Sequence, residues 1–291
     1  MRTLINIVSI SPNKVPATTM KALINAFPDG ARYRDEPQGK VLAAFRCALF
    51  SSNPVMRRIL AILKTDGFEP WLDDSRERRP NEYWVRWKHD YDPEELAAAD
   101  LLRPHPRIYS EGLHRNKKGL IQLQYEKLKK RAGVAFTGSG LIVANRIKTI
   151  LQDEMSHAIF RPTVVMKGPL LVERTLVPWK EIGPPFWELI SDLILPPLSP
   201  SMTLLDKNGH PCNGNFSNGC YMKEGLYENP EPHYTRKAIK KAGKFDVALT
   251  HERFGINPAE EDRQLIVSPR FYKICTEAKL EMDWTIVRID P

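Results

Sequence analysis

A short sequence pattern occurs twice in this chain and restricts the possible folds more than any other feature. Residues 141–147, LIVANRI, are matched by residues 265–271, LIVSPRF, 124 positions further along. In each copy a β-branched run is followed by a residue suited to begin a helix, and then by apolar residues at helical spacing. A second strand follows each helix. Residues 137–165 and 262–290 are therefore each predicted to form a strand-helix-strand motif.

The helical positions of the two copies agree with one another. Arg146 and Arg270 occupy the same position in the two predicted helices. The apolar residues that we expect to be buried are Ile147, Ile150 and Leu151 in the first copy and Phe271, Ile274 and Cys275 in the second. An internal duplication explains this agreement, and convergence of two unrelated motifs on one pattern is the alternative.

Length and composition favour a globular protein with two domains. A chain of 291 residues is long enough for two separate cores. Its hydrophobic content of 42% and charged content of 27% are ordinary for a soluble globular protein. We expect an α+β fold with domains at 1–165 and 166–291, each ending in one strand-helix-strand motif. A long surface loop rich in Asn, Gly and Tyr is expected at 206–234.

Local patterns predict further elements. Asp92, Pro93 and Glu95 together form a strong helix start. Apolar residues recur from 186 to 194 with the spacing of a helix that has one buried face. Strands are favoured in residues 83–87 and 245–249, the first by aromatic and β-branched content and the second by alternation. The predicted helices are 17–26, 54–65, 93–102 and 186–194.

The N-terminal segment and the cysteines bear on the cellular compartment. Residues 1–10 contain a short apolar run, interrupted by Asn6, which suits a strand better than a signal peptide. Residues 41–50 form the longest other apolar stretch and fall well short of the ~20 residues that span a bilayer. We therefore expect a cytoplasmic protein with no membrane partner. Its cysteines would then be reduced thiols, namely Cys47, Cys212, Cys220 and Cys275.

The net charge of +8 is concentrated in two segments. Nine Lys or Arg residues lie between 103 and 131, against two glutamates. The residues that we single out in this first basic patch are Lys117, Lys118, Lys127, Lys129, Lys130 and Arg131. Residues 236–244 contain five Lys or Arg and no acid. Such patches attract nucleic acid, anionic membranes or acidic protein surfaces, and a solvated basic face without a partner is the alternative.

Patterns for catalysis or metal binding are weak. His210, Cys212 and Cys220 do not have the spacing of a common zinc site. Glu277 and Lys279 resemble the acid and lysine of restriction-type nucleases, but they fall at a predicted helix end, where a surface role is the better interpretation. The sequence contains no Gly-x-Ser-x-Gly nucleophile motif. We therefore predict no catalytic residues, no metal and no cofactor, with an enzyme of an unrecognised kind as an alternative.

Two parts of the chain resemble a known family. FDVALTHERFG at 245–255, taken with residues 265–271 and WTIVR at 284–288, resembles the C-terminal signature of bacterial immunity proteins. These proteins are antidotes to toxins of type VI, contact-dependent or other polymorphic toxin systems. Residues 83–87 and 91–99 are similar to the other half of such proteins. Some relatives carry a doubled Cys-x-x-Cys-Gly zinc motif, which this chain lacks, so zinc binding is not expected here.

The resemblance implies a protein that binds and neutralises a cognate antibacterial toxin, with a nuclease among the candidate toxins. Neutralisation would come from covering the toxin's active site or substrate groove. A nucleic-acid-binding regulator that uses the basic segments 103–131 and 236–244 is the alternative. We rank nucleic acid below a protein partner, because the sequence has no helix-turn-helix, no RNA-binding platform and no aromatics interleaved with its lysines.

Two sets of residues are candidates for contact with a toxin. Aromatic residues in the long loop combine apolar area with flexible glycine neighbours, as recognition loops do. An acidic face before the predicted helix at 93–102 would oppose a basic substrate cleft. The candidates are the aromatic Phe216, Tyr221 and Tyr227 and the acidic Asp90, Asp92 and Glu94. Because the whole chain is basic, the alternative is a toxin that is acidic where it is bound.

Overall fold

The computed structural model of the chain contains two compact units. The first comprises Met1–Asp92 and Met222–Pro230, and the second comprises Pro93–Tyr221 and Glu231–Pro291, so the chain passes between them at three points. Among the described residues, no helix is both long enough and apolar enough to span a bilayer. The residues that the structure describes are 2–10, 15–36, 39–50, 53–71, 82–106, 113–116, 118–124, 134–137, 140–167, 175–182, 184–202, 204–205, 221–222, 231–254 and 263–291.

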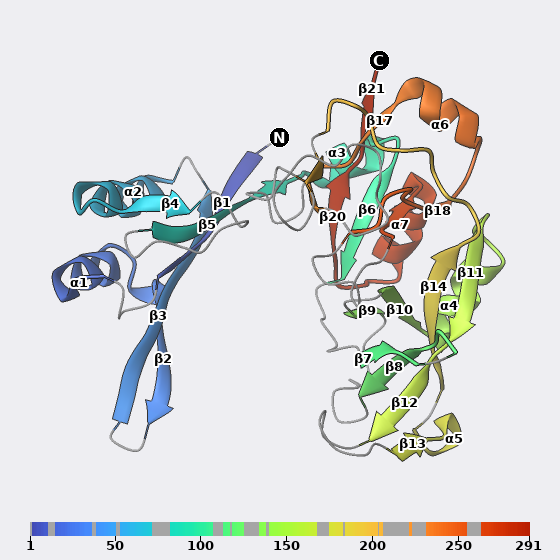
Figure 1. Cartoon of the computed structure of the whole chain (residues 1–291), viewed down its shortest axis with the longest axis horizontal. Helices are drawn as coiled ribbons and strands as arrows, with labels where there is room; N and C mark the ends of the chain where they lie inside the picture. Colours follow the sequence, from blue (N-terminus) through green and yellow to red (C-terminus); the bar gives the residue numbers. More distant parts are fainter. Residues whose placement is uncertain are drawn as a thin grey trace. The chain divides into compact units, whose positions relative to one another are not determined.

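The first unit is a five-stranded sheet with two helices (Figure 1). Helices α1 (Ala17–Ala26) and α2 (Pro54–Thr65) pack against each other and against β3. The strands, in the order β2-β3-β1-β5-β4, are β1 (Arg2–Ile10), β2 (Ala31–Glu36), β3 (Gly39–Phe50), β4 (Glu69–Trp71) and β5 (Glu82–Asp90). A short 3-10 turn, η2 (Pro28–Gly30), leads into β2. Because β3 separates β1 from β2 and β1 separates β3 from β5, this is a split βαββαβ topology with β4 added at one edge.

The two helices of the first unit begin and end where the sequence predicts. The Asn53 side chain caps α2 by accepting a hydrogen bond from the Val55 N–H at 2.8 Å. Gly67, with φ of 76°, follows the C-terminal end of α2 in the left-handed conformation that glycine tolerates best. Ile59 and Leu63 are fully buried on the apolar side of α2. The unit therefore has a core of its own, made by these helices and one face of the sheet.

Two four-stranded antiparallel sheets form the centre of the second unit. The first has the order β11-β14-β10-β9 and consists of β9 (Val134–Thr137), β10 (Gly140–Ala144), β11 (Ala158–Pro162) and β14 (Phe186–Ser191). The second has the order β18-β19-β6-β20 and consists of β6 (Leu102–Pro106), β18 (Val247–Leu249), β19 (Leu265–Val267) and β20 (Met282–Ile286). Helix α4 (Asn145–Gln152) connects β10 to β11, and α7 (Pro269–Glu277) connects β19 to β20.

Both predicted strand-helix-strand motifs are present, as β10-α4-β11 and β19-α7-β20. In each sheet the two strands of a motif are separated by one antiparallel strand from elsewhere in the chain. The inserted strand is β14 in the first motif and β6 in the second. β14 follows the first motif in sequence, whereas β6 precedes both motifs. The shared topology is compatible with a duplication, which stays a prediction.

The two sheets are also connected through their edges. The Leu195 N–H donates to the Leu249 carbonyl at 2.8 Å, and the Leu249 N–H donates to the Leu193 carbonyl at 2.9 Å. The chain after β14 therefore pairs with β18 of the other sheet. β9 in turn lies against β6. These connections make the two motifs parts of one interlocked body.

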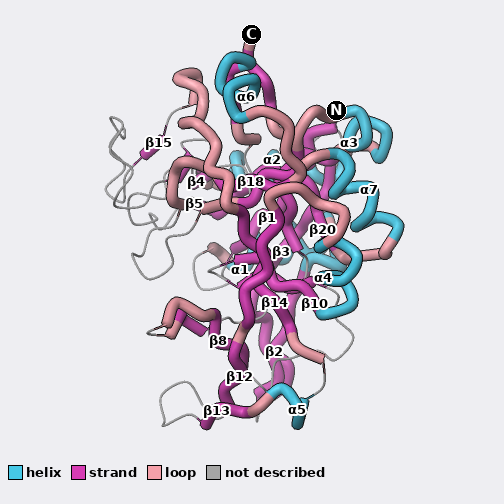
Figure 2. Tube along the Cα trace, turned by 90° about the vertical axis from the view of Figure 1, so that its right-hand side faces the viewer, coloured by secondary structure: helices cyan, strands magenta, loops and turns pink. Residues whose placement is uncertain are grey.

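Helices α4 and α7 each bury one apolar stripe. Leu151 in α4 and Phe271 and Cys275 in α7 are buried as predicted, and so is Ile147, whereas Ile274 is only half-buried. The prediction that Ile150 is buried is wrong, because Ile150 is 43% exposed and lies beside the stripe. Arg270, at the start of α7, pairs with Glu154 just beyond α4. Figure 2 shows α3 (Pro93–Ala98), α7 and α4 along the same side of the second unit.

Shorter elements complete the second unit. A third sheet has the order β13-β12-β8-β7 and contributes Ile121, Leu123 and Val165 to a core that includes Ile142 and Phe186. The remaining strand pairs are β15-β16 and the parallel pair β17-β21. Their bounds, with those of two further helices, are β7 (Leu113–Arg115), β8 (Ile121–Gln124), β12 (Val164–Lys167), β13 (Thr175–Val177), α5 (Trp179–Ile182), β15 (Leu204–Leu205), β16 (Tyr221–Met222), β17 (His233–Thr235), α6 (Arg236–Ala242) and β21 (Arg288–Asp290).

The helix predicted at 186–194 is wrong, because this segment contains the strand β14. β14 lies between β11 and β10, with buried residues on both of its faces. A strand covered on both sides loses the alternation of apolar and polar residues that identifies a half-exposed strand. The helix predicted at 93–102 is present only as α3, which ends at Ala98, and Leu102 begins β6.

The chain does not divide into its two compact units at residue 165, where the sequence predicts the domain boundary. The first division of the chain falls between Asp92 and Pro93, and the strands on either side of residue 165, β11 and β12, both belong to the second unit. The inserted strands explain this difference. Because β6 completes the sheet of the second motif and β14 that of the first, a cut at 165 would leave both sheets incomplete.

Candidate functional site

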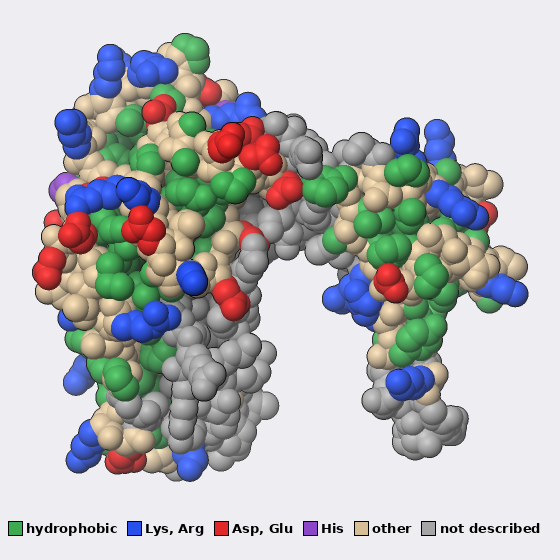
Figure 3. Space-filling model, turned by 180° about the vertical axis from the view of Figure 1, so that it is seen from behind, with side chains coloured by type: hydrophobic (Ala, Val, Ile, Leu, Met, Phe, Trp, Pro, Cys, Tyr) green, Lys and Arg blue, Asp and Glu red, His purple; other side chains and the backbone are tan. Residues whose placement is uncertain are grey.

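Helix α6 places a row of cations on the surface of the second unit. Thr235 caps this helix by accepting a hydrogen bond from the Ala238 N–H at 3.1 Å. Arg236 and Lys240 are four residues apart and therefore share one helix face. Gly243 ends the helix with φ of 79°, and Lys244 follows it. All three cations are exposed, and Figure 3 shows Lys and Arg side chains gathered over this part of the unit.

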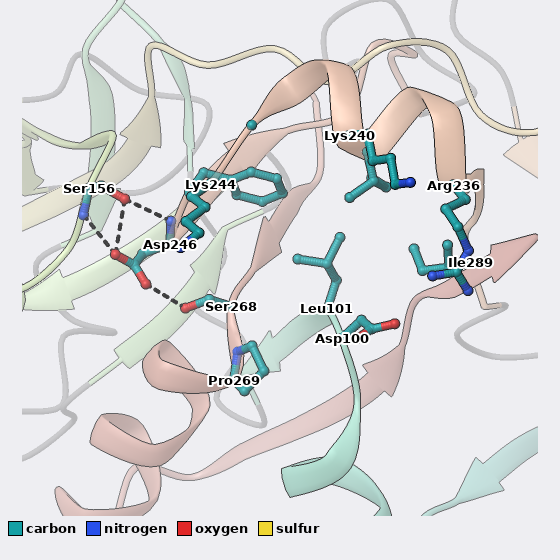
Figure 4. A pocket seen from close by; sticks show the side chains of 13 residues that line it. Asp100, Leu101, Ser156, Arg236, Lys240, Lys244, Asp246, Ser268, Pro269 and Ile289 are labelled. Carbon is teal, nitrogen blue, oxygen red and sulfur yellow. Dashed lines mark hydrogen bonds between the residues drawn. The ribbon is translucent and has the colours of Figure 1, made fainter.

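A hollow of about 530 Å³ lies beside these cations, and we call it the basic hollow. Arg236, Lys240 and Lys244 line the side formed by α6 and the residues after it. Leu101 and Pro269 face this side from across the hollow (Figure 4). The volume lies within the ~300–1,000 Å³ that is usual for ligand pockets, far above the ~30 Å³ of one water.

Apolar side chains make up about half of the inner surface of the basic hollow. Leu101 and Phe245 line it and are 6% and 8% exposed, so both side chains are held in place by the packing of the core. Ile239 of α6 and Ile289 of β21 are half-buried and also line the hollow. The hollow therefore combines a partly apolar inner surface with a cationic rim.

Asp246 is held in place at the edge of the hollow. Its Oδ2 accepts hydrogen bonds from the N–H and the hydroxyl of Ser156, both at 3.0 Å, and its Oδ1 accepts one from the Ser268 hydroxyl at 2.7 Å (Figure 4). Burial alone would raise the pKa of Asp246, but these hydrogen bonds and the charge of Arg270 outweigh it and lower the pKa. Since Ser156 follows α4 and Ser268 caps α7, Asp246 connects the two motifs.

The cations of the hollow are not neutralised by neighbouring acids. The acids among the described lining residues are Asp100 and Asp246, and the oxygens of Asp246 are occupied by serine donors. Within the described part of the chain, Arg236, Lys240 and Lys244 form no ion pair. The three cations therefore outnumber the two acids that line the hollow, of which Asp100 is exposed, and the rim keeps a net positive charge.

A second cluster contains the residue types of a serine hydrolase but not their arrangement. The Ser199 and Ser201 hydroxyls both donate to Asp290 Oδ2, at 2.5 and 2.6 Å. His233 Nδ1 lies 3.5 Å from Ser201 Oγ and 3.5 Å from Asp290 Oδ1. In a catalytic triad the histidine lies between the serine and the carboxylate, using a different ring nitrogen for each. Here the serines bond directly to the carboxylate, so the cluster fastens residues 199–201 to β21.

Glu188 forms a buried ion-pair cluster. It is fully buried on β14 and accepts hydrogen bonds from both Arg115 and Arg161. Arg115 comes from β7 and Arg161 from β11, so the cluster connects two sheets of the second unit. All contacts are made within the protein, which gives this cluster a structural role.

Glu252 and Tyr234 form a buried polar pair with unused hydrogen-bonding capacity. Both residues are fully buried, and neither Glu252 Oε2 nor the Tyr234 hydroxyl has a hydrogen-bond partner. Glu252 Oε1 accepts a hydrogen bond from the Leu198 N–H at 2.8 Å. Burial raises the pKa of Glu252. Burial and the charge of Glu252 also raise the pKa of Tyr234, against the opposite effect of Arg103.

Possible metal and nucleophile positions are few in the described residues. No group of three His, Cys, Asp or Glu side chains there is arranged to hold a metal ion. Cys47 and Cys275 are buried, and burial raises the pKa of the Cys275 thiol to about 12. Glu277 is the last residue of α7 and lies 4.0 Å from Lys273, which confirms the predicted helix end. Cys212, Cys220 and His210 lie outside the described residues.

The structure describes only some of the predicted toxin-contact residues. Asp90 and Asp92 belong to the first unit, whereas Glu94 belongs to the second, in the first turn of α3. All three acids are exposed. Phe216 and Tyr227 lie outside the described residues, and for Tyr221 only the backbone, in β16, is described.

The first basic patch is described only in part. Lys118 is exposed, in a turn where Asn116 Oδ1 accepts hydrogen bonds from the Lys118 and Leu120 N–H groups. Two cations of the wider segment 103–131 contribute little to a binding surface, because Arg103 is buried and Arg115 forms an ion pair with Glu188. The remaining residues that we singled out, Lys117, Lys127, Lys129, Lys130 and Arg131, lie outside the described residues.

Sequence reasoning found the cations of the basic hollow but not the hollow itself. The spacing of Arg236, Lys240 and Lys244 was visible in the segment 236–244. Leu101, Ser156 and Ser268 come from parts of the chain far from that segment. No local pattern connects them, because their proximity depends on how the two motifs interlock.

Comparisons with known proteins give no relative from which the role of the hollow could be taken. No family model, no curated protein and no solved structure matches this chain. A function must therefore be inferred from the chemistry of the residues described above.

Proposed function

We propose that this chain is a neutralising protein of the bacterial immunity type, which binds a cognate antibacterial toxin in the cytoplasm and covers its active site or substrate groove. The resemblance of residues 245–255, 265–271 and 284–288 to the signature of such antidotes suggests the class. The basic hollow supplies the physical support, because it is an open surface feature with a net positive charge and a partly apolar interior. Both properties suit recognition of another molecule.

The hollow is preorganised for binding. Asp246 and its serine partners fix the relative positions of the two motifs on either side of it. The apolar part of the inner surface is made of core residues, among them Leu101 and Phe245. A surface that is already ordered loses little conformational entropy when it binds, which favours slow dissociation from a partner. Slow dissociation is what an antidote to a toxic enzyme requires.

The charge of the hollow favours a toxin that is acidic where it is bound. The cations on α6 would attract an acidic surface and speed the encounter with it. A metal-dependent nuclease fits this description, since the carboxylates that hold its catalytic metal form an acidic cluster at its active site. Occupying that cluster would block both metal and substrate.

The proposal predicts that the reading frame next to this chain's gene encodes the toxin, and the test uses the product of that frame. We expect the purified pair to form a stable complex with a dissociation constant of about 1 nM or below, which corresponds to roughly −12 kcal/mol. Isothermal titration calorimetry would give the affinity, and the toxin's own activity assay would show whether binding abolishes turnover. Absence of a complex, or a complex in which the toxin keeps full activity, would refute the proposed function.

A nucleic-acid partner is the second candidate, favoured by the unpaired cations along α6. Binding to DNA or RNA would depend steeply on salt, because counterions are released from the phosphates. The burial of Arg103 and the pairing of Arg115 reduce the charge that the segment 103–131 can offer. Fluorescence anisotropy with a labelled oligonucleotide at two salt concentrations would separate this function from the first.

A further inference from the structure

The spacing of the cations in the basic hollow carries information about what it recognises. Arg236 and Lys240 are separated by four residues of helix, which is about 6 Å along the axis at 1.5 Å per residue. Lys244 continues the row beyond the end of α6. Charges spread in this way suit separate anionic groups along an extended ligand better than one compact anion.

The period of an extended polypeptide matches this spacing. Residues i and i+2 of a β-strand lie on the same face, about 6.6 Å apart at 3.3 Å per residue. Two acidic side chains in such a segment could therefore each approach one of the cations Arg236 and Lys240. The residue between the two acids points to the opposite face of the segment.

The opposite side of the hollow carries apolar side chains, with Asp100 and Ser268 beside them (Figure 4). Leu101 and Pro269 face α6 from across the hollow (Figure 4), and Phe245 and Ile289 complete the inner surface. An apolar side chain between the two acids would point toward these residues, and burying it there would be favourable at about 25 cal/mol per Å². The volume of about 530 Å³ is ample for one large side chain and its flanking backbone.

Nucleic acid lacks a matching contact in the hollow. Single-stranded nucleic acid is usually held by bases stacking on exposed aromatic rings. Phe245 is the one aromatic among the described lining residues, and at 8% exposed its ring is part of the core. The hollow thus offers charge to a phosphate backbone but no stacking surface to a base.

We infer that the basic hollow binds an extended acidic protein segment with an acid-apolar-acid sequence. The two acids pair with the cations of α6, and the apolar side chain between them contacts Leu101 and Pro269. The inference rests on the proposed function only for the source of the segment, which is then the toxin.

Synthetic peptides test this inference directly on the full-length chain. The probe is a fluorescein-labelled peptide of about ten residues centred on Glu-Leu-Glu, with Glu-Ser-Glu and Gln-Leu-Gln versions as controls. We expect the Glu-Leu-Glu peptide to bind at least about tenfold more tightly than either control, because each control removes one of the two contacts. Equal binding of all three peptides, or tighter binding of an oligonucleotide of the same charge, would overturn the inference.

The helix itself supplies a matched pair of variants. Arg236→Glu/Lys240→Glu reverses two charges on the lining face, whereas Lys237→Glu/Lys241→Glu reverses two charges of α6 outside the residues that line the hollow. Each pair changes one residue in the first turn and one in the last, so their effects on the helix are alike. We expect the first variant to weaken peptide binding at least about tenfold and the second to change it less than about threefold; equal effects would overturn the inference.

Measurements with the toxin separate this inference from the proposed function. If the wild-type chain binds the peptide but not the toxin, the proposed function fails and the inference stands. If the Arg236→Glu/Lys240→Glu variant binds the toxin as tightly as the wild type, the proposed function stands and the inference is overturned.

Discussion

At the scale of single residues, Glu188 and Glu252 of the second unit are both fully buried but lie in opposite environments. Glu188 accepts hydrogen bonds from two arginines, which offset the cost of burying its charge. Among the described residues, Glu252 has the Leu198 N–H as its one donor from another residue, and its Oε2 has no hydrogen-bond partner. Burial accordingly raises the pKa of Glu252. Ionised Glu252 therefore opposes folding at neutral pH.

This environment predicts how stability depends on pH. Between the unfolded pKa near 4.5 and the raised folded pKa, the folded chain binds more protons at Glu252 than the unfolded chain does, so this residue lowers stability as pH rises. Glu252→Gln removes the charge and keeps an acceptor for Leu198. We expect the variant to melt within about 1 °C of the wild type at pH 4 and at least about 2 °C above it at pH 8, as measured by calorimetry.

A control separates this charge effect from packing. Glu252→Ala also removes the charge but leaves the Leu198 N–H without an acceptor, which should make it about 1–3 kcal/mol less stable than Glu252→Gln at every pH. The lowered pKa values of Asp246 and Asp290 affect the wild type and both variants alike, so they cancel in the comparison. A melting difference for Glu252→Gln that does not change with pH would contradict the prediction.

At the scale of elements, helix α4 buries only a narrow apolar stripe, made of Ile147 and Leu151. α4 also contacts Trp187 of β14. Lys148 Nζ lies 3.9 Å from the centre of the Trp187 ring, and Asn145 Oδ1 accepts a hydrogen bond from the Trp187 indole at 2.9 Å. Leu151 is fully buried, whereas Ile150, its neighbour in sequence, is 43% exposed. Because the two positions are adjacent but differ in burial, substituting each of them tests how α4 is packed.

Placing aspartate at each of these positions gives opposite expected results. Leu151→Asp buries an unpaired carboxylate and leaves a cavity, which together cost several kcal/mol of the roughly 5–15 kcal/mol that stabilise a domain. Ile150→Asp places the same charge in solvent and should change stability by no more than about 1 kcal/mol. Urea denaturation of both variants checks this, and equal losses of stability would show that α4 is packed differently.

At the scale of the whole molecule, the positions of β6 and β14 in the two central sheets determine which fragments can fold. β6 completes the sheet of the second motif and β14 completes the sheet of the first. The second unit therefore begins near Pro93, and residues 166–291 contain only some of the strands of each sheet. A fragment lacking an inner strand would expose unpaired backbone groups and core side chains.

Expression of two fragments tests this arrangement. Residues 93–291 should unfold cooperatively on heating, as a folded domain does. Residues 166–291 should lack a cooperative transition and aggregate, because both central sheets are incomplete. Circular dichroism at increasing temperature distinguishes the two results. Cooperative melting of 166–291 would contradict the interlocked arrangement.

Local spacing in the sequence was enough to predict the helices α1 and α2, the strand β5 and both strand-helix-strand motifs. Each of these depends on residues close together in the chain, such as the cap Asn53 or the stripe of Ile147 and Leu151. The same reasoning identified the cations of segment 236–244. It did not identify β14, because burial of both faces removes the alternation that marks a strand.

Tertiary structure alone decided which strands complete the two central sheets and what surrounds the cations of α6. Strand pairing is satisfied by backbone groups that nearly all residues other than proline carry, so the choice of β6 and β14 as partners depends on packing over the whole unit. The basic hollow follows from that choice, since it brings Leu101, Ser156 and Ser268 to α6 from three distant segments. The sequence thus determined the local elements and the charge, and the packing between distant segments made them a site.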